Sequence, residues 1–204
     1  ETMMTSKDIS MKMIDICNDL YDGQPGDDTT CVVVRAEEHR YVTLFSGPPL
    51  DRTKDSMIKE IFDEAKGKKV VCGGTASNIV SREYGEEINI DLSTMSQEVP
   101  PVGSMPYIDL ITEGVITIQE TVRIIREYID KREGNKAFKG NNGAEILADT
   151  LVNYATHIDF ILGNSINPAH QNPDFPDALT SKWKITQELI NLLKELNKAV
   201  NIIY

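Results

Sequence analysis

From Tyr41 onward, the sequence alternates short apolar segments with longer segments whose apolar residues recur every three or four positions. The short segments are typical of strands buried on both faces of a sheet, and the longer ones are typical of amphipathic helices. Because a strand, a crossover helix and the next parallel strand form a right-handed unit, this alternation predicts a mostly parallel sheet covered on both faces. We expect an α/β three-layer sandwich with about six strands.

The pattern places the individual elements as follows. The expected strands cover residues 41–45, 69–72, 88–92, 107–111, 158–162 and 200–203. The expected helices cover residues 53–65, the stretch from the glycine turn after residue 72 to residue 84, 118–129, 144–155 and 181–196. Ahead of this alternation, residues 6–20 predict an amphipathic helix and residues 31–34 a short buried strand. We therefore divide the chain into a short segment, residues 1–38, and an α/β (Rossmann-like) domain, residues 39–204.

The composition and net charge of the chain indicate which classes of molecule it is unsuited to bind. The chain of 204 residues is 40% hydrophobic and 26% charged, with a formal net charge of −11. An acidic surface repels phosphate backbones and anionic lipids, so we expect neither nucleic acid nor membrane partners. No apolar run approaches the roughly 18 residues of a membrane span, and no signal-peptide pattern is present. Cys17, Cys31 and Cys72 are widely separated, which is typical of buried free thiols in a reducing compartment, so we expect a cytoplasmic protein.

The segment from Gly26 to Val34 places two carboxylates, Asp27 and Asp28, directly before the predicted strand 31–34. A hard divalent cation such as Mg²⁺ or Mn²⁺ prefers anionic oxygen ligands held on a rigid support. Aspartate and glycine before a strand more often form a turn, with the threonines beginning the strand. These residues alone leave both interpretations open.

The order of helix, Leu20-Tyr21, glycine-rich turn, Asp27-Asp28-x-Thr30 and valine strand resembles the closing motif of 2C-class metal-dependent protein phosphatases, in the branch typified by stage II sporulation protein E. The resemblance implies that Asp27 binds one of two active-site Mn²⁺ or Mg²⁺ ions, and that the whole protein dephosphorylates serine or threonine in a phosphoprotein. It covers only residues 6–35. The family's other acidic motifs lie upstream of this match, and two-metal chemistry needs several carboxylates. We therefore expect this segment alone to be inactive.

The remainder of the chain is similar to a bacterial domain found carboxy-terminal to such phosphatase domains. The similarity covers nearly all of residues 41–204, and it implies a neighbouring domain without implying a reaction. The segments that carry it are Gly47-Pro48-Pro49, Val71-Cys72-Gly73-Gly74-Thr75, Ile111-Thr112-Glu113-Gly114-Val115 and Asn167-Pro168-Ala169-His170-Gln171-Asn172-Pro173.

Small and polar residues follow several of the predicted strands, where parallel α/β sheets bind ligands. After residues 69–72 come Gly73, Gly74, Thr75 and Ser77, whose backbone N–H groups and hydroxyls are suited to a phosphate or a carboxylate. The alternative is a tight turn with Thr75 as the helix N-cap. Neither a Walker loop nor a dinucleotide fingerprint is present.

After residues 107–111 come Glu113 and Gly114. Glu113 is either an acceptor for a ribose hydroxyl, a base, or a solvated turn residue, while Thr117 and Glu120 form a plausible capping box. After residues 158–162 comes a long loop stiffened by prolines, in which His170 is either a ligand contact or a surface residue. His39 and His157 have no such neighbours and are interpreted as structural or solvated. The loop adds four candidate ligand-binding residues: Asn164, Asn167, His170 and Asn172.

These observations favour a regulatory module that binds a small anionic or nucleotide-like ligand. The alternatives are an independent enzyme acting on that ligand, or an interaction domain without a ligand. Because the predicted strands are parallel, we expect the candidate residues to converge at the carboxyl edge of the sheet. Residues 6–35 are too few to bury a core of their own, so they should pack on the larger domain, pair with another copy or be mobile.

Overall fold

The computed structural model describes residues 4, 6–24, 26–47, 55–130, 138, 140–163 and 177–203, without the side chains of residues 177–181. The chain divides into two compact units, which are described separately. One comprises Glu1–Glu38 and Tyr128–Ala137, and the other comprises His39–Glu127 and Phe138–Tyr204.

The larger unit contains a seven-stranded sheet with the strand order β3-β4-β5-β2-β1-β6-β7. The fold is the expected mostly parallel α/β class. Five strands are mutually parallel, and β3 and β4 extend the sheet beyond β5 in antiparallel fashion. The strand bounds are β1 Tyr41–Ser46, β2 Lys68–Cys72, β3 Asn89–Asp91, β4 Val102–Met105, β5 Ile108–Thr112, β6 His157–Leu162 and β7 Ala199–Ile203.

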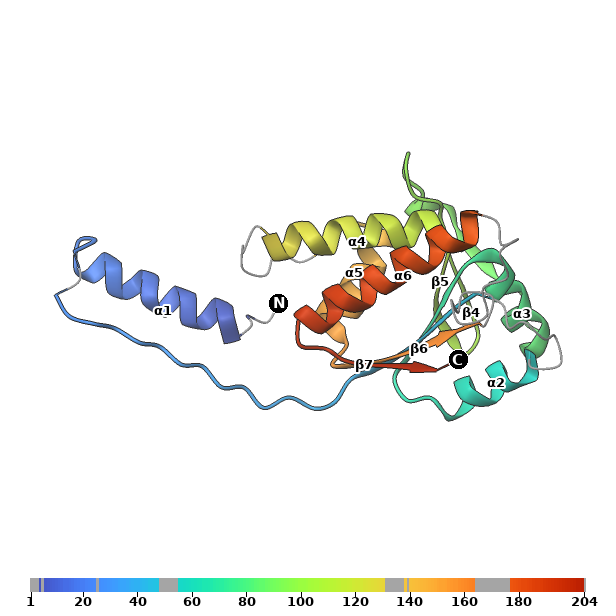
Figure 1. The fold of residues 1–204 in the computed structure, drawn as a ribbon, viewed down its shortest axis with the longest axis horizontal. Helices are drawn as coiled ribbons and strands as arrows, with labels where there is room; N and C mark the ends of the chain where they lie inside the picture. The colour runs from blue at the N-terminus through green and yellow to red at the C-terminus, as the bar shows by residue number, and fades with distance from the viewer. Residues whose placement is uncertain are drawn as a thin grey trace. The chain divides into compact units, whose positions relative to one another are not determined.

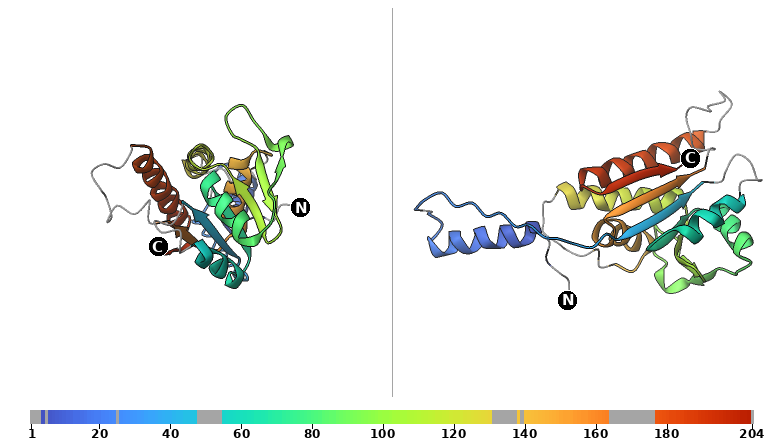
Figure 2. Two further views of the ribbon diagram at one scale, coloured as in Figure 1. Left: turned by 90° about the vertical axis from the view of Figure 1, so that its right-hand side faces the viewer. Right: turned by 90° about the horizontal axis from the view of Figure 1, so that it is seen from below.

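The helices cover the sheet in two layers. The views in Figures 1 and 2 show α2 (Asp55–Glu64) and α3 (Gly74–Tyr84) on one face, with α4 (Val115–Asp130), α5 (Gly143–Asp149) and α6 (Asp177–Glu195) on the other. A 3-10 turn, η2 (Leu92–Thr94), follows β3, and α5 continues into a π-helical turn (Thr150–Tyr154).

The core explains why the apolar strands are nearly continuous. On the face covered by α2 and α3, a buried cluster joins Phe45 of β1, Val71 of β2 and Ile111 of β5 to Phe62 of α2 and Val80 of α3. Because successive strand residues point to opposite faces, the intervening apolar residues line the other helical layer. A strand buried on two faces therefore has no polar alternation, which is the pattern that predicted it.

Two short strand assignments were wrong. No strand was expected between the predicted strands 88–92 and 107–111, but Val102–Met105 forms β4 by pairing with both β3 and β5. Residues 31–34 were expected to be a strand, but they have no strand assignment and pair with no described strand. A segment forms a strand only where another strand pairs with it, and the residues of these two segments do not show whether such a partner is present.

In the smaller unit, helix α1 (Ser6–Leu20) has the expected bounds, and none of its residues is buried. Its apolar residues remain partly open to solvent, among them Met13 (47% exposed) and Leu20 (78%), and Val34 of the extended segment is 90% exposed. One hydrogen bond, from Arg35 Nη1 to the Met4 carbonyl (3.0 Å), joins the extended segment to the residues before α1. None of the described residues of this unit is buried.

Candidate anion-binding site

The site lies where two neighbouring parallel strands end. Cys72 closes β2 and Thr112 closes β5, and the two residues are register partners. Beyond them the Gly73 N–H donates to the Thr112 carbonyl (2.9 Å), so the paired chains stay together for one more residue. A Cβ atom on Gly114 would lie 3.2 Å from the Gly73 Cα atom. Glycine at both positions therefore lets the two strand ends approach each other closely.

The start of α3 presents free backbone donors at this edge. Its N-cap is Gly73, which has φ 117° and ψ 140° and provides no side-chain capping bond. The first helical N–H groups, those of Gly74, Thr75 and Ala76, have no acceptor within the helix. These donors and the positive end of the helix dipole favour an anion. The interpretation of Thr75 as the N-cap was wrong because the helix begins one residue before it.

Lys182 is the residue that the sequence interpretation missed. It projects from α6 across the strand ends, and its Nζ lies 3.4 Å from the position of a Cβ atom on Gly73 and 3.8 Å from that on Gly114. Burial lowers the pKa of Lys182, and the nearby Cys72 and Glu113 oppose that shift. Among the described side chains, none forms a hydrogen bond or an ion pair with its ammonium group. The ammonium group is therefore a desolvated cation beside the free donors of α3.

Two acidic groups near Lys182, the Cys72 thiol and the Glu113 carboxyl, influence the pKa of the lysine. Burial raises the pKa of the Cys72 thiol to about 11, although a hydrogen bond with Thr112 lowers it in part. The thiol is therefore neutral at physiological pH and carries no charge to balance the lysine. Glu113 is partly exposed and its charge favours the protonated lysine. One carboxylate thus faces one ammonium without direct contact.

Glu113 also caps the neighbouring helix. Its Oε2 accepts a hydrogen bond from the Ile116 N–H (3.1 Å), which satisfies one of the free donors at the start of α4. The helix begins at Val115, three residues before the expected start. The capping box of Thr117 and Glu120 was therefore wrong: Thr117 lies within the first helical turn, fully buried, and Glu120 pairs with Arg123 instead. The start of α4 is therefore capped by the Glu113 side chain, whereas the start of α3 has no side-chain cap.

The other candidate residues at this edge differ in what they offer a ligand. Gly74 and Thr75 are exposed, so their N–H groups are accessible from solvent. Ser77 is 5% exposed and its hydroxyl donates to the Gly73 carbonyl (2.9 Å). The expectation that Ser77 offers its hydroxyl to an anion was wrong, because the serine hydroxyl hydrogen already bonds the preceding helical turn.

The loop candidates Asn164, Asn167, His170 and Asn172 lie outside the described residues. Gly163, which precedes them, donates its N–H to the Ser46 carbonyl at the end of β1 (3.3 Å). The five parallel strands reverse their order between β1 and β6, the point at which open α/β sheets bind ligands most often. The described candidates instead follow the ends of β2 and β5, two neighbouring strands to one side of that point: Gly73, Gly74, Thr75, Glu113 and Gly114.

Asp27 lies in the smaller unit, on an exposed turn. Its Oδ1 accepts a hydrogen bond from the Asp28 N–H (2.8 Å), which is the local turn interaction typical of aspartate. Across the described residues, no group of three or more histidine, cysteine, aspartate or glutamate side chains is arranged to hold a metal ion. Cys17 and Cys31 are partly exposed free thiols, so the expectation of buried cysteines is correct for Cys72 alone.

Comparison with known proteins found no relative of this chain. A scan against protein-family models, a search of curated proteins and a search of solved structures each gave no match. Within the part of the chain that the structure describes, no helix has both the length and the apolar character of a membrane span. The function is therefore inferred from the residues of the site.

Proposed function

We propose that the chain is the carboxy-terminal part of a metal-dependent protein serine/threonine phosphatase, and that its α/β domain is a regulatory module for a small anionic ligand. The observation that carries the ligand proposal is the position of Lys182. A desolvated ammonium group, the free N–H groups of α3 and the glycine-lined strand ends lie at one edge of the sheet. Together they provide a positive site in a chain whose net charge is −11.

The geometry favours a phosphate or carboxylate group as the bound anion. Backbone N–H groups at a helix start and a lysine ammonium group are the donors that such oxygens accept. Glu113 lies beside this position, and one of its oxygens already caps α4. Its other oxygen is suited to accept a hydrogen bond from a hydroxyl group on the same ligand. A nucleotide or a phosphorylated metabolite carries both the anion and the hydroxyl.

The phosphatase proposal depends on the segment around Asp27. Its resemblance to the closing motif of 2C-class phosphatases assigns Asp27 to one of two Mn²⁺ or Mg²⁺ ions in the complete active site. The exposed apolar residues of α1 and of the extended segment support this assignment, because a helix and an extended segment with uncovered apolar side chains are incomplete as a unit. The proposed substrate is a phosphoprotein, and the ligand of the α/β domain would change the rate of its dephosphorylation.

A thermal-shift experiment tests the ligand proposal. Purified protein is titrated with inorganic phosphate, pyrophosphate and adenosine monophosphate at constant ionic strength, with chloride as the reference anion. A ligand present at 100 times its Kd stabilises the folded state by about 2.7 kcal/mol. For a domain of this size, each 1 kcal/mol raises Tm by about 2–4 °C. We expect a rise of about 5–10 °C at this concentration for at least one of these anions, and a further rise with the logarithm of the anion concentration.

The variant Gly74→Leu should abolish that rise without unfolding the protein. A Cβ atom on Gly74 would contact nothing within 4 Å, and the residue does not have a positive φ. The leucine side chain would instead cover the free N–H groups of α3. The matched control is Asn78→Leu, which adds a leucine at another exposed position of the same helix. An equal shift in wild type and Gly74→Leu would contradict the proposed site.

The phosphatase proposal has a separate test. Residues 1–204 alone should not hydrolyse p-nitrophenyl phosphate with Mn²⁺ or Mg²⁺, because Asp27 lacks its partner carboxylates. A longer protein that includes the preceding sequence should hydrolyse it. Asp27→Ala should lower that rate by about 100-fold or more, because losing a direct metal ligand costs at least as much as the roughly 10- to 100-fold loss from mutating a ligand's hydrogen-bonding partner. Full activity in the Asp27→Ala protein would refute the assignment of Asp27.

A further inference from the structure

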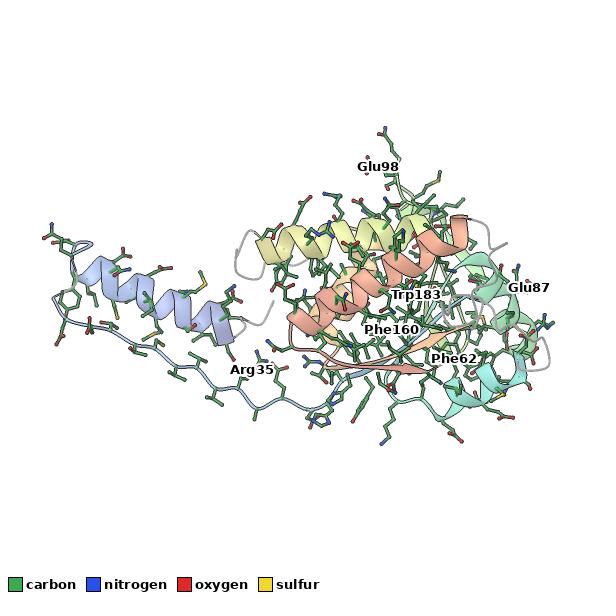
Figure 3. All side chains as sticks on the ribbon, viewed as in Figure 1. Arg35, Phe62, Glu87, Glu98, Phe160 and Trp183 are labelled. Carbon is green, nitrogen blue, oxygen red and sulfur yellow. The ribbon has the colours of Figure 1, made fainter. Side chains whose placement is uncertain are left out.

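The charges of the larger unit are unevenly distributed along the chain. Between Glu83 and Val122 there is no lysine, arginine or histidine. This stretch includes both antiparallel strands and the loops that flank them. It contains these acidic residues: Glu83, Glu86, Glu87, Asp91, Glu98, Asp109, Glu113 and Glu120. Of these, Glu87 and Glu98 are exposed and point away from the body of the unit (Figure 3). Strand β3 and its flanking loops therefore expose the carboxylates of Glu87, Asp91 and Glu98, whereas Glu83 and Glu120 pair with Arg82 and Arg123.

The strand at this end has only one partner. β3 pairs with β4 and forms the edge of the sheet, and all three of its residues are exposed. Such an edge leaves alternate backbone N–H and C=O groups free to pair with another chain. Proteins commonly protect an edge with a short strand, a charge, a lysine or a proline; β3 has only its three-residue length and Asp91, and it contains no lysine or proline. No strand in the described part of the chain covers it.

Large apolar side chains are exposed along the same edge. Ile90 of β3 is 54% exposed, Leu92 72% and Met95 65%. A Cβ atom on Gly103 of β4 would lie 3.2 Å from Ile90 Cδ1, so the absence of a side chain there gives the isoleucine its place on the sheet. Ile90 is therefore held in position by the neighbouring strand while more than half of its surface remains open to a partner.

Tyr107 extends this apolar surface at the opposite end of β3. It occupies the two-residue turn between β4 and β5 with φ 70°, a conformation that is strained for an aromatic residue. Its ring stacks on that of Tyr84 (centroids 5.6 Å apart, 22° between planes) and remains 67% exposed. Strained conformations persist where the surrounding structure enforces them, and they are concentrated at functional positions.

We infer that the β3 edge binds an extended, basic segment of a partner protein, which adds to the sheet as an eighth strand. The free backbone groups of β3 provide the pairing, and alternate apolar side chains of the segment contact Ile90 and Tyr107. Lysine or arginine side chains of the segment face Glu87 and Asp91. A second copy of this chain is disfavoured as the occupant, because it would present the same acidic edge to an acidic edge.

Fluorescence anisotropy with a labelled seven-residue peptide of alternating lysine and valine tests this inference. We expect saturable binding that weakens at least 5-fold between 50 and 500 mM NaCl, because the charges are exposed and salt screens them. A peptide of alternating glutamate and valine should bind at least 10-fold more weakly. Amide hydrogen exchange should slow at residues 89–92 when the basic peptide is bound.

Two variants make the result specific to the edge. Ile90→Lys places a positive charge and removes the apolar contact, and it should weaken binding at least 5-fold. Met57→Lys is the matched control, because Met57 is similarly exposed (49%) but lies on α2. Equal affinity of wild type and Ile90→Lys, or equal affinity for the two peptides, would overturn the inference. Sedimentation that shows a wild-type dimer and an Ile90→Lys monomer would also overturn it, in favour of a second copy.

Discussion

Replacing Lys182 with methionine separates the ligand site from the stability of the fold. The two side chains have similar length and shape, and methionine carries no charge. In the free protein the ammonium group is desolvated and has no direct partner among the described side chains, so burying it costs free energy. Lys182→Met should therefore leave the free energy of unfolding unchanged or raise it slightly at pH 7.

The same substitution should weaken the binding of an anion. A hydrogen bond to a charged group contributes about 1.5–3 kcal/mol, and each 1.4 kcal/mol changes Kd tenfold. The expected loss of affinity for the best anion is therefore about 10- to 150-fold. The measurement is a titration of the fluorescence of Trp183, the only tryptophan of the chain, which follows Lys182 on α6 (Figure 3).

The pH dependence of stability provides an independent check of the lysine. Its folded-state pKa lies below the ordinary value of 10.5, so the unfolded chain binds more protons between those two values. The free energy of unfolding then rises with pH in that window, and it lacks this rise in Lys182→Met. Lys184→Met is the matched control, because Lys184 is the exposed lysine two residues further along α6. A Lys182→Met protein that is unstable, or that binds the anion as tightly as Lys184→Met does, would refute the reasoning.

Two further substitutions test the packing and the charges of the fold. Gly67→Ala should cost at least about 2 kcal/mol more than Gly85→Ala in chemical denaturation: both residues have positive φ, but a Cβ atom on Gly67 would lie 2.1 Å from the Tyr41 carbonyl oxygen, whereas one on Gly85 meets nothing within 4 Å. Glu120→Gln should lower Tm at pH 7, because the hydrogen bond from Arg123 lowers the pKa of Glu120 below its ordinary value of 4.5. That loss should disappear as the pH falls below 4.5, where the wild-type carboxylate becomes protonated, and a constant loss at all pH values would contradict the assignment.

Much of the α/β fold follows from local patterns. The parallel strands are rich in apolar residues, and β1, β2 and β5 end in a small or polar residue. Each helix has an apolar stripe, so both kinds of element are recognised from their own residues. β4 was missed because Val102-Gly103-Ser104-Met105 has no such run, and only its two neighbouring strands make it a strand. Residues 31–34 show the converse, since a run of valines does not form a strand without a neighbour.

The candidate site was predictable only in part. Gly73, Gly74 and Glu113 follow predicted parallel strands, and the rule that such strands end at one edge places them together. Lys182 comes from a different helix far along the chain, and its approach to Gly73 depends on how α6 packs across the sheet. A lysine near the start of a helix opposes the helix dipole, and this was the one signal in the sequence that could have singled it out.

The most direct test of the account is the response of individual backbone amides to inorganic phosphate, measured by two-dimensional NMR at constant ionic strength. We expect saturable chemical-shift changes with a single Kd for the amides of Gly74, Thr75 and Ala76, with no comparable change in chloride. These shifts should weaken in Lys182→Met and persist in Lys184→Met. Shifts that are absent at these three amides, or that are equal in the two lysine variants, would contradict the claim that an anion binds at this edge of the sheet.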